Sequence, residues 1–362
     1  MSRADDHGGM ADGDGVGPHR REGQLHARVN ESHDILVAAL ARMGIVDADE
    51  QPAIVALTGG VSSEIYRIDS RRGSVCAKRA LPRLRVAATW EVPVERNRYE
   101  REWLEVAGTI AAGAVPAVLA HDDDAGVFVM TYLPAATHPV WKAMLRDGRA
   151  EPGVAGAVGA LLGRLHAATA DDDAVAARFP TDALFEALRL EPYFGAVGRA
   201  HPDLADRLDA LHRRTATTRR VLLHGDVSPK NILIGPAGPV FIDAECATFG
   251  DPAFDLAFCA NHLLLKCLWN PSAAPLFIEC FDALTTTYLA AVDWEDRRDV
   301  EARSATLLPA LLLARVDGKS PVEYLDDTGR ATVRTVARRL LVGAEIPTLP
   351  EIRDRWRTEA LA

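Results

Sequence analysis

Residues 221–245 read VLLHGDVSPKNILIGPAGPVFIDAE, and this stretch constrains the fold more than any other part of the chain. Its apolar runs are short, and Ser-Pro-Lys and Gly-Pro-Ala-Gly-Pro segments separate them, so the runs suit strands rather than helices. Asp226, Asn231 and Asp243 stand where these runs end. We therefore expect two short strands that present three oxygen-donor side chains together.

Carboxylate and amide oxygens are suitable ligands for a hard divalent cation. Mg²⁺ combines a few protein oxygens with phosphate oxygens and water. The plainer alternative is a pair of Asx turns that cap a hairpin, since Asp and Asn are common in turns. Because His224 and Gly225 accompany the three polar residues in one compound motif, a functional site is the preferred interpretation.

Length and composition set the broad class. A chain of 362 residues exceeds the size at which one core grows comfortably, which predicts two lobes or domains. Apolar residues make up 48% and charged residues 25%, close to the averages for soluble globular proteins. The formal net charge of −10 argues against a partner with a phosphate backbone, so we expect no nucleic-acid partner.

Cysteine usage and hydropathy indicate a cytoplasmic protein. The five cysteines are scattered without CxxC spacing, and an odd number does not close a disulfide framework. The longest apolar runs, such as 307–316, fall short of the roughly 20 residues that cross a bilayer. Residues 1–30 lack the apolar segment of a signal peptide and are expected to be a disordered tail. We expect reduced thiols and no membrane span.

The periodicity of apolar residues changes near Pro134. Strand-like runs lie at 54–69, 73–81 and 115–134, and helical patterns lie at 31–45, with Ser32 as N-cap, and at 92–112, 152–170 and 203–218. The pattern predicts a small β-rich lobe over 31–133 and a larger, mainly helical lobe over 134–362.

Three blocks, HGDVSPKN, FIDAE and FGDPAFDLA, follow one another in the second lobe. Together they resemble the aminoglycoside phosphotransferase and choline kinase family, which has a protein-kinase-like fold. The resemblance implies an α+β, two-lobed fold and the Mg²⁺-dependent transfer of the γ-phosphate of ATP or GTP to a hydroxyl group. The implied partners are a nucleoside triphosphate and a small metabolite or antibiotic, and the state is a monomer or homodimer.

The family's catalytic roles fall on particular residues of these blocks. The resemblance makes Asp226 the group that orients or deprotonates the acceptor hydroxyl, with Asn231 and Asp243 as ligands of magnesium. Asp251 and Asp255 would hold the catalytic loop in place. Phosphoryl transfer needs positioning and charge neutralisation more than covalent chemistry, which suits this set.

A lysine on a strand of the first lobe is the next requirement of a kinase-like fold. VCAK supplies Lys78, which would grip the phosphates and be held by a glutamate of the following helix. Glu100 and Glu102 are both available there, and Glu100 is our choice because Leu104 follows it at the family's spacing. A solvated charged face is the alternative for either residue.

The segment TGGVSSE precedes Lys78 and departs from a GxGxxG pattern. Gly59 and Gly60 would let the backbone approach phosphate, and Ser62 and Ser63 would add donors. A plain hairpin turn uses the same residues.

Farther along, VFVMTYLP resembles the family's hinge, in which Thr131, Tyr132 and Leu133 would contact the purine. Thr131 stands where the family often has an acidic residue, so ATP and GTP both stay open. His166, in LLGRLHAAT, is expected to be structural, and Lys230 either touches the γ-phosphate or faces solvent.

Two segments are candidates for the acceptor pocket. His262 and Lys266 lie one helical turn apart, and ARVDGKSPVEYL clusters Arg315, Asp317 and Lys319. An apolar helix followed by a solvated charged turn is the alternative. A polycationic aminoglycoside would favour an acidic pocket, whereas this mixture of signs suits a neutral sugar, a nucleoside or an amino alcohol.

Other classes remain to be weighed. ERNRYEREWL and WKAMLRDG resemble segments of 5-methylthioribose kinases, which makes a kinase of that type the runner-up. HGD in place of HRD, and the lack of DFG and APE blocks, speak against a protein kinase. A nucleotide-binding pseudo-enzyme is the alternative from a different class, and the presence of Lys78, Asp226, Asn231 and Asp243 speaks against it.

Overall fold

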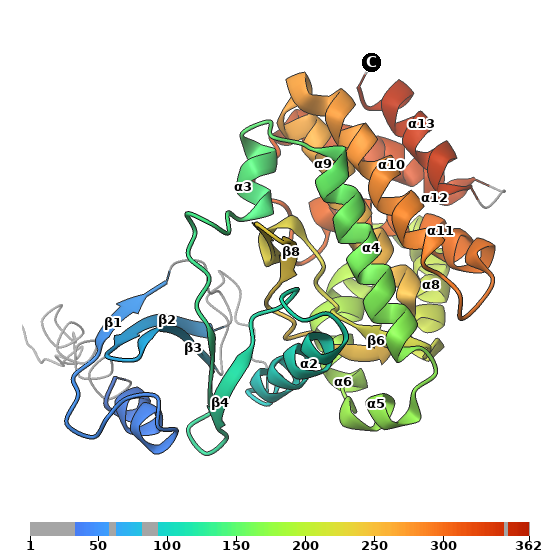
Figure 1. Cartoon of the computed structure of the whole chain (residues 1–362). Helices are drawn as coiled ribbons and strands as arrows, with labels where there is room; N and C mark the ends of the chain where they lie inside the picture. The colour runs from blue at the N-terminus through green and yellow to red at the C-terminus, as the bar shows by residue number, and fades with distance from the viewer. Residues whose placement is uncertain (1–32, 58–62, 82–92, 344–346, 362) are drawn as a thin grey trace, which may run out of the picture.

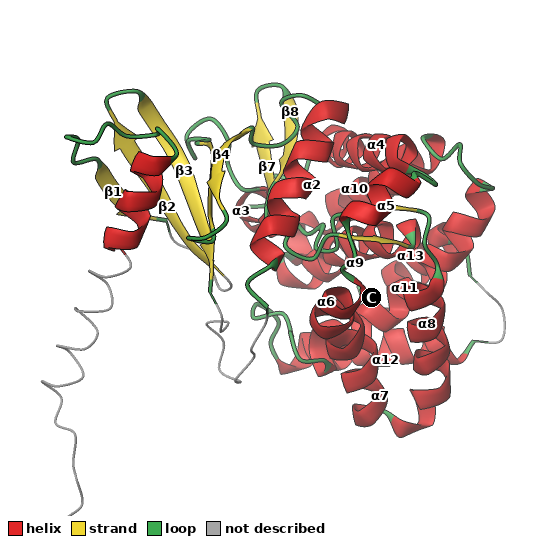
Figure 2. Cartoon of the chain, turned by 90° about the horizontal axis from the view of Figure 1, so that it is seen from below, coloured by secondary structure: helices red, strands yellow, loops and turns green. Residues whose placement is uncertain are grey.

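The computed structural model describes residues 33–57, 63–81, 93–343 and 347–361. A lobe built around one sheet stands beside a larger, mainly helical lobe (Figures 1 and 2), which confirms the predicted α+β two-lobed architecture. The proposed tail, 1–30, and the proposed N-cap, Ser32, lie outside the described residues. Within those ranges no helix has the length and apolar character that a bilayer crossing requires.

The smaller lobe contains a five-stranded antiparallel sheet in the order β1-β2-β3-β5-β4. Its strands are β1 (Ala53–Ala56), β2 (Ser63–Ser70), β3 (Gly73–Ala80), β4 (Val118–Asp122) and β5 (Val127–Thr131). The predicted antiparallel pairings are confirmed, and the 54–69 run divides into two strands. The sheet ends at Thr131, and the next helix begins at Trp141.

The sheet has two different faces because neighbouring residues of a strand point in opposite directions. Helix 33–42 packs Leu36 and Leu40 on one face, against Ala77 of β3. Cys76 belongs to the main core on the other side, and Lys78 shares its face. Helix α2 (Arg96–Ile110), within the predicted 92–112, links β3 to β4 and joins the same main core.

The larger lobe is mostly helical. Its α-helices are α3 (Trp141–Arg146), α4 (Pro152–Thr169), α5 (Asp173–Arg178), α6 (Asp182–Phe185), α7 (Ala196–Ala200), α8 (Ala205–Thr217), α9 (Pro252–Trp269), α10 (Ala274–Ala290), α11 (Arg297–Asp317), α12 (Asp327–Val342) and α13 (Leu349–Glu359). A π-helical segment, η1, spans Glu186–Gly195, and 3₁₀ turns lie at η2 (Pro202–Leu204), η3 (Pro229–Asn231) and η4 (Pro271–Ala273). The helices predicted at 152–170 and 203–218 are confirmed as α4 and α8.

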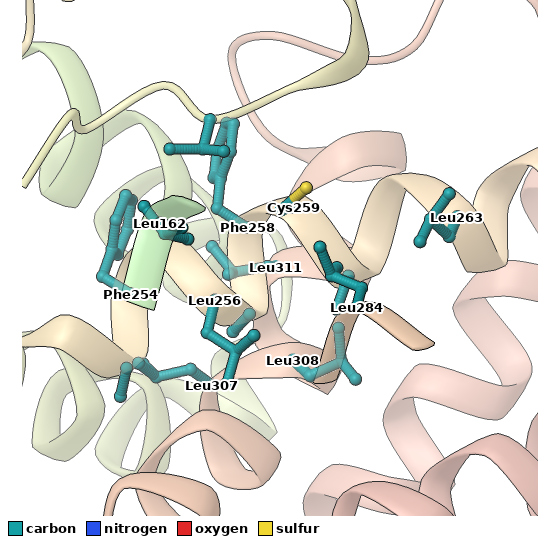
Figure 3. Close-up of a cluster of buried hydrophobic side chains, with 14 of the residues drawn as sticks. Leu162, Phe254, Leu256, Phe258, Cys259, Leu263, Leu284, Leu307, Leu308 and Leu311 are labelled. Atoms are coloured by element: carbon teal, nitrogen blue, oxygen red, sulfur yellow. The ribbon is translucent and has the colours of Figure 1, made fainter. Parts of the chain in front are cut away.

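Helix α9 is buried along nearly its whole length and organises this lobe. Figure 3 shows its Phe254 and Leu256 among leucines of α4 and α11, and Leu263 farther along the helix is fully buried. Burial of apolar surface on this scale is the main stabilising contribution in a domain. It also fixes the end of α9, which carries His262 and Lys266, against α11, which carries Arg315.

Residues 221–250 form two small two-stranded sheets. Strand β6 (Val221–Leu223) pairs with β9 (Thr248–Gly250), and β7 (Ile232–Gly235) forms a hairpin with β8 (Gly238–Phe241). The predicted short strands are therefore present. Asn231, however, precedes β7 instead of ending a strand, because the Ser-Pro-Lys segment leads into the 3₁₀ turn η3.

Candidate active site

A cleft of about 710 Å³ is lined by residues of both lobes. Most of the residues proposed from the motifs line this one cleft: Lys78, Glu100, Thr131, Tyr132, Leu133, Asp226, Asn231 and Asp243. Gly59, Gly60 and Ser62 lie outside the described residues. Ser63 begins β2, where it is buried opposite Ala80, and it is not among the residues that line the cleft.

Lys78 lies between two carboxylates that come from different parts of the chain. Its position on β3, opposite Ile65 and Phe128, directs the side chain to the cleft face of the sheet. Its Nζ is 2.7 Å from Oε2 of Glu100 on α2 and also donates to Oδ1 of Asp243. The ammonium group therefore links the two lobes through a pair of ionic contacts.

Burial and charge act in opposite directions on this group. Burial disfavours the ammonium form of Lys78, but Asp243 and Glu100 outweigh burial and raise its pKa above the ordinary value. Burial raises the pKa of Glu100 to about 7, against the opposing effect of Lys78. The pKa of Asp243 is lowered because Lys78 and Lys230 outweigh its burial.

The second glutamate of α2 has different partners. Glu102 accepts from Arg98 at 2.7 Å and lies 3.5 Å from Arg178, away from Lys78. Glu100 is thus the residue that the fold brings to the lysine, the glutamate chosen from the family's spacing to Leu104. Glu102 serves as a matched comparison on the same helix.

The proposed catalytic loop, residues 224–231, is fixed by hydrogen bonds to its backbone. Asp255, fully buried on α9, accepts from the backbone N–H of His224 at 2.7 Å and of Gly225 at 3.0 Å. Gly225 has φ +75°, and a Cβ there would collide with the carbonyl oxygen of Cys246. Only glycine fits this position, which explains the second residue of the HGD motif.

His224 joins the catalytic loop to the segment that carries Asp243. Its Nε2 lies 3.0 Å from the carbonyl oxygen of Ile242, and its Nδ1 accepts from the backbone N–H of Asp226 at 3.2 Å. Burial lowers the pKa of His224, which favours the neutral ring. A neutral imidazole with its proton on Nε2 satisfies both contacts.

Asp226 is surrounded by donors. Its Oδ2 lies 3.0 Å from Nη2 of Arg189, 3.2 Å from Nζ of Lys230 and 2.9 Å from Nδ2 of Asn231. Burial would raise the pKa of this carboxyl, but Arg189 and Lys230 outweigh burial and lower it. Asp226 is therefore held ionised, and its position is fixed from three sides.

Asn231 and Asp243 provide the oxygen donors suited to a metal ion. The amide nitrogen of Asn231 donates to Asp226, which leaves the amide oxygen for a ligand. Asp243 follows β8 with φ 66°, a left-handed conformation that a short polar residue tolerates. No cluster of three or more His, Cys, Asp or Glu suited to a metal occurs within the described ranges. Two protein oxygens suit Mg²⁺ that also binds phosphate and water.

Asp251 and His166 support the fold around the site. Asp251 caps α9 by accepting from Ala253 N and pairs with Arg303 at 3.1 Å. His166 is fully buried, with Nδ1 2.8 Å from the hydroxyl of Tyr288 and Nε2 3.4 Å from Asp255. The structure thus places His166 behind the catalytic loop, away from the cleft lining.

Three of the five acceptor candidates line the cleft, namely His262, Lys266 and Arg315. The other two are turned to other partners. Asp317 binds Arg334 at 2.6 Å and His201 at 2.8 Å, and Lys319 lies 2.6 Å from Glu191. Asp317 ends α11 and Lys319 follows it, and neither lines the cleft, although Ser320 and Tyr324 farther along do.

Sequence reasoning missed several polar residues of the cleft, chiefly Arg189, Lys142, Glu323 and Tyr324. Arg189 lies in the π-helical segment η1 and also donates from Nε to the carbonyl oxygen of Gly225 at 2.6 Å. The available signal was an arginine among apolar residues in ALRLEPYF. Lys142 of α3 and Glu323 in the loop after α11 form an ion pair. No local sequence pattern predicts this pair.

A two-lobed fold with a lysine–glutamate pair above and an Asp-Asn-Asp set below defines the class of kinase-like phosphotransferases. The model of the phosphotransferase enzyme family matches residues 53–299, and the chain belongs to this family. That assignment confirms the resemblance seen in the three motif blocks.

Curated relatives include methylthioribose kinases, the runner-up from the sequence. The protein of that name from Yersinia enterocolitica is 25% identical over 260 residues, covering 64% of this chain and 63% of the relative. The one from Pectobacterium atrosepticum is 27% identical over 230 residues, covering 56% and 57%. The chain thus spans less than two thirds of the length of these relatives.

Solved structures share the fold at low identity. Amicoumacin kinase in complex with AMP-PNP, Ca²⁺ and Ami has a TM-score of 0.54 at 18% identity, covering 90% of this chain and 97% of that one. Choline kinase from Cryptosporidium parvum has a TM-score of 0.53 at 10% identity, covering 85% and 95%. At these identities the likeness shows the fold alone.

Proposed function

We propose that this protein is a magnesium-dependent small-molecule kinase that transfers the γ-phosphate of ATP or GTP to a hydroxyl group. The observation that carries the proposal is the convergence of Lys78 with Glu100, and of Asp226 with Asn231 and Asp243, in one cleft that both lobes line. These residues come from segments far apart in the sequence. In one cleft they bring together a cation for the phosphates, oxygen donors for a metal and a carboxylate for the acceptor hydroxyl, which phosphoryl transfer requires.

Each group has a role in the reaction. Asp226, held ionised, orients the acceptor hydroxyl and takes its proton as the oxygen attacks the γ-phosphorus. A new O–P bond forms, the bond from phosphorus to the β-phosphate oxygen breaks, and the nucleoside diphosphate leaves. Lys78 binds the phosphates of the nucleotide, while Thr131, Tyr132 and Leu133 line its base. Lys230 pairs with Asp226 at 3.2 Å, and in this proposal it also contacts the transferred phosphoryl group.

Asn231 and Asp243 would hold the metal, which neutralises charge on the phosphate oxygens when it is bound. The amide oxygen of Asn231 is left available by the hydrogen bonds of its nitrogen. Asp243 also contacts Lys78. The same carboxylate thus lies within reach of both the cation on the sheet and the metal site below it.

The test is phosphate transfer from ATP and, separately, from GTP in the presence of Mg²⁺. The acceptor panel contains 5-methylthioribose, amicoumacin, choline, aminoglycosides, nucleosides and small hydroxy acids. Mass spectrometry detects an acceptor that gains one phosphoryl group. Transfer by the wild-type chain and its loss in Asp226→Asn support the proposal.

The contrary result is equally clear. Mg·nucleotide binding without transfer to any acceptor, and without nucleotide hydrolysis that depends on Asp226, favours the pseudo-enzyme alternative. Failure to bind Mg·nucleotide at all contradicts both the kinase proposal and the pseudo-enzyme alternative. Transfer of phosphate to 5-methylthioribose alone would give this protein the activity for which its curated relatives are named.

A further inference from the structure

The acceptor half of the cleft has a charge opposite to that of the whole chain. The chain carries a formal net charge of −10. The cleft around and beyond Asp226 is lined by five cations, Lys142, Arg189, Lys230, Lys266 and Arg315, and by two carboxylates, Asp226 and Glu323. A basic pocket in an acidic protein concentrates anions locally.

Two of these cations have no carboxylate of their own. Arg189 and Lys230 pair with Asp226, and Lys142 pairs with Glu323. Within the part of the chain that the structure describes, no carboxylate lies at ion-pair distance from Lys266 or Arg315. Lys266 is buried and Arg315 is partly buried. Cations withdrawn from water are normally paired, so these two side chains need an explanation.

Lys266 lies against a pair of stacked aromatic rings. Its Nζ lies 3.7 Å from the ring centre of Tyr324 and 4.2 Å from that of Trp269, and the two rings stack on each other. The side chain is 1% exposed. Cation–π contacts partly compensate for lost solvation, but they leave the hydrogen-bonding capacity of the amine unused.

Arg315 points to the same conclusion. Its Nη1 donates to the hydroxyl of Tyr193 at 3.1 Å and to Oγ of Ser320 at 3.1 Å. Its Nε is buried and has no hydrogen-bond partner within the described ranges, and neither has the hydroxyl of Tyr324. Buried donors without a partner are costly, so the polar surroundings of Arg315 are not fully satisfied by the chain itself.

We propose, on the basis of the kinase function above, that the phosphate acceptor carries an anionic group, a carboxylate or a phosphate, which binds Lys266 and Arg315. Its hydroxyl group then faces Asp226 in the same cleft. Tyr193, Phe258 and Tyr324 form the apolar and aromatic walls around it.

Other charge types of acceptor fit less well. A cationic acceptor, such as an amino alcohol or an aminoglycoside, would meet Lys266 and Arg315 directly, and the carboxylate of Glu323 is already paired with Lys142. A neutral sugar would leave Arg315 without a counter-charge and the amine of Lys266 without an anionic partner. An anion alone supplies what the pocket lacks.

The state of Lys266 adds a signature for this binding. Burial, Lys142 and Arg315 lower its pKa to about 6, opposed by Glu323. The neighbouring His262 favours the neutral form, because burial and Arg315 lower its pKa. An anion beside Lys266 restores the ammonium form, so binding near pH 7 takes up a proton.

The test uses matched probes at pH 7 and saturating Mg·AMP-PNP, which occupies the phosphate side of the cleft. Calorimetry compares L-tartrate with L-threitol and glycerol 3-phosphate with glycerol, which differ in charge but share a carbon skeleton. We expect at least one anion to bind about tenfold or more tightly than its neutral partner. The two pairs distinguish carboxylate from phosphate, and choline serves as the cationic probe.

Variants assign the preference to the two cations. Lys266→Met and Arg315→Gln should each weaken anion binding about tenfold, with the affinity for Mg·AMP-PNP unchanged. Lys319→Met is the matched control, because Lys319 pairs with Glu191 outside the cleft lining. Comparison of two buffers with different ionisation enthalpies should show proton uptake in the wild type and its loss in Lys266→Met.

Several results overturn the inference. These are equal binding of anionic and neutral partners, tighter binding of choline, or anion binding that neither variant weakens. If Arg315→Gln fails to fold, Lys266→Met alone decides. A protein that selects anions but binds no Mg·nucleotide and transfers no phosphate refutes the kinase function while leaving the anion pocket standing.

Discussion

The proposed nucleotide side of the cleft, around Lys78, and its proposed acceptor side, around Lys266 and Arg315, differ in whether their cations have carboxylate partners. On the nucleotide side, Lys78 has Glu100 and Asp243 as counter-charges. On the acceptor side, Lys266 and Arg315 have no carboxylate at ion-pair distance in the described ranges. On the nucleotide side the cation is paired within the protein, which suits a co-substrate that is the same in every reaction, a nucleoside triphosphate with its metal. On the acceptor side the basic groups of Lys266 and Arg315 lack a counter-charge, which an anionic acceptor would supply.

The largest expected effect follows from a substitution of Asp226, which lies between the nucleotide side and the acceptor side of the cleft. Asp226→Asn keeps the size of the side chain but removes the charge that Arg189 and Lys230 surround. We expect the transfer rate to fall by about two orders of magnitude or more, because the acceptor hydroxyl loses its base. Steady-state kinetics with the identified acceptor measures the fall, and equilibrium titration should show nucleotide affinity little changed.

Asp317→Asn is the control for this prediction. Asp317 is also an ion-paired aspartate of the larger lobe, but its partners are Arg334 and His201 and it does not line the cleft. Its substitution should leave turnover unchanged. An undiminished rate in Asp226→Asn would contradict the role of Asp226 and would place the chemistry elsewhere in the cleft.

The nucleotide side was largely predictable from the sequence because its chemistry imposes spacing. The HGD motif needs glycine beside Cys246, and Asp226 and Asn231 lie close enough in sequence to share one loop. The lysine of β3 and the glutamate of α2 were inferred from the resemblance to the kinase-like family, and the fold brings them into contact. The family and the two-lobed fold could therefore be inferred, whereas Gly59, Gly60 and Ser62 lie outside the described residues.

The second prediction concerns the metal side of the nucleotide half. Asp243→Asn preserves a residue type that tolerates the left-handed backbone at this position, so the change removes charge without adding strain. We expect Mg·nucleotide affinity to fall about tenfold or more, because one anionic ligand is lost. Titration with and without Mg²⁺ measures it, and Asp243→Ala would confound ligand loss with backbone strain.

An unchanged affinity for Mg·nucleotide in Asp243→Asn would refute the ligand assignment. A fall of the same size in the absence of Mg²⁺ would show that Asp243 acts on Lys78 alone. The comparison of the two titrations therefore separates the two contacts of this carboxylate.

The acceptor side resisted prediction because its partners meet only in three dimensions. Lys142 precedes Glu323 by most of the length of the larger lobe, and nothing local in WKAMLRDG indicates the ion pair. Arg189 lies in a π-helical segment, whose side-chain spacing departs from that of an α-helix. Proximity in sequence was also misleading, because Asp317 and Lys319 lie close to Arg315 in the chain but bind partners away from the cleft lining.

The third prediction compares two glutamates of one helix. Glu100→Gln should raise the KM for ATP several-fold, about three to ten times, because Lys78 loses one of its two anionic partners. Glu102→Gln should leave KM unchanged, since Glu102 pairs with Arg98 and Arg178. Equal effects of the two substitutions would show that the helix contributes only general charge.

The pH dependence of KM sharpens the same comparison. Because burial raises the pKa of Glu100 to about 7, the carboxylate form that holds Lys78 is lost as pH falls through 7. The wild-type KM for ATP should therefore rise toward pH 6, and this part of the pH dependence should disappear in Glu100→Gln. A pH dependence that persists in the variant would assign it to another group.

The smallest expected effect lies on the acceptor side and is a gain in stability. Lys266→Met replaces a buried amine by an apolar side chain of similar length, so we expect about 1 kcal/mol more free energy of unfolding at pH 6. The lost cation–π contacts with Tyr324 and Trp269 limit the gain. Lys319→Met, at an exposed ion pair, should change stability by no more than about 0.5 kcal/mol.

The sign of the pH effect distinguishes this gain from ordinary repacking. The pKa of Lys266 is about 6 in the folded chain and 10.5 in a model peptide, so between these values the unfolded chain binds a proton that the folded chain does not. Wild-type stability at this site therefore rises with pH across that window, and the advantage of Lys266→Met should shrink from pH 6 to pH 9.5. Urea titrations at both pH values measure the difference. A variant less stable than the wild type at pH 6 would mean that the aromatic contacts outweigh burial, so that the lysine is held charged even without a bound anion.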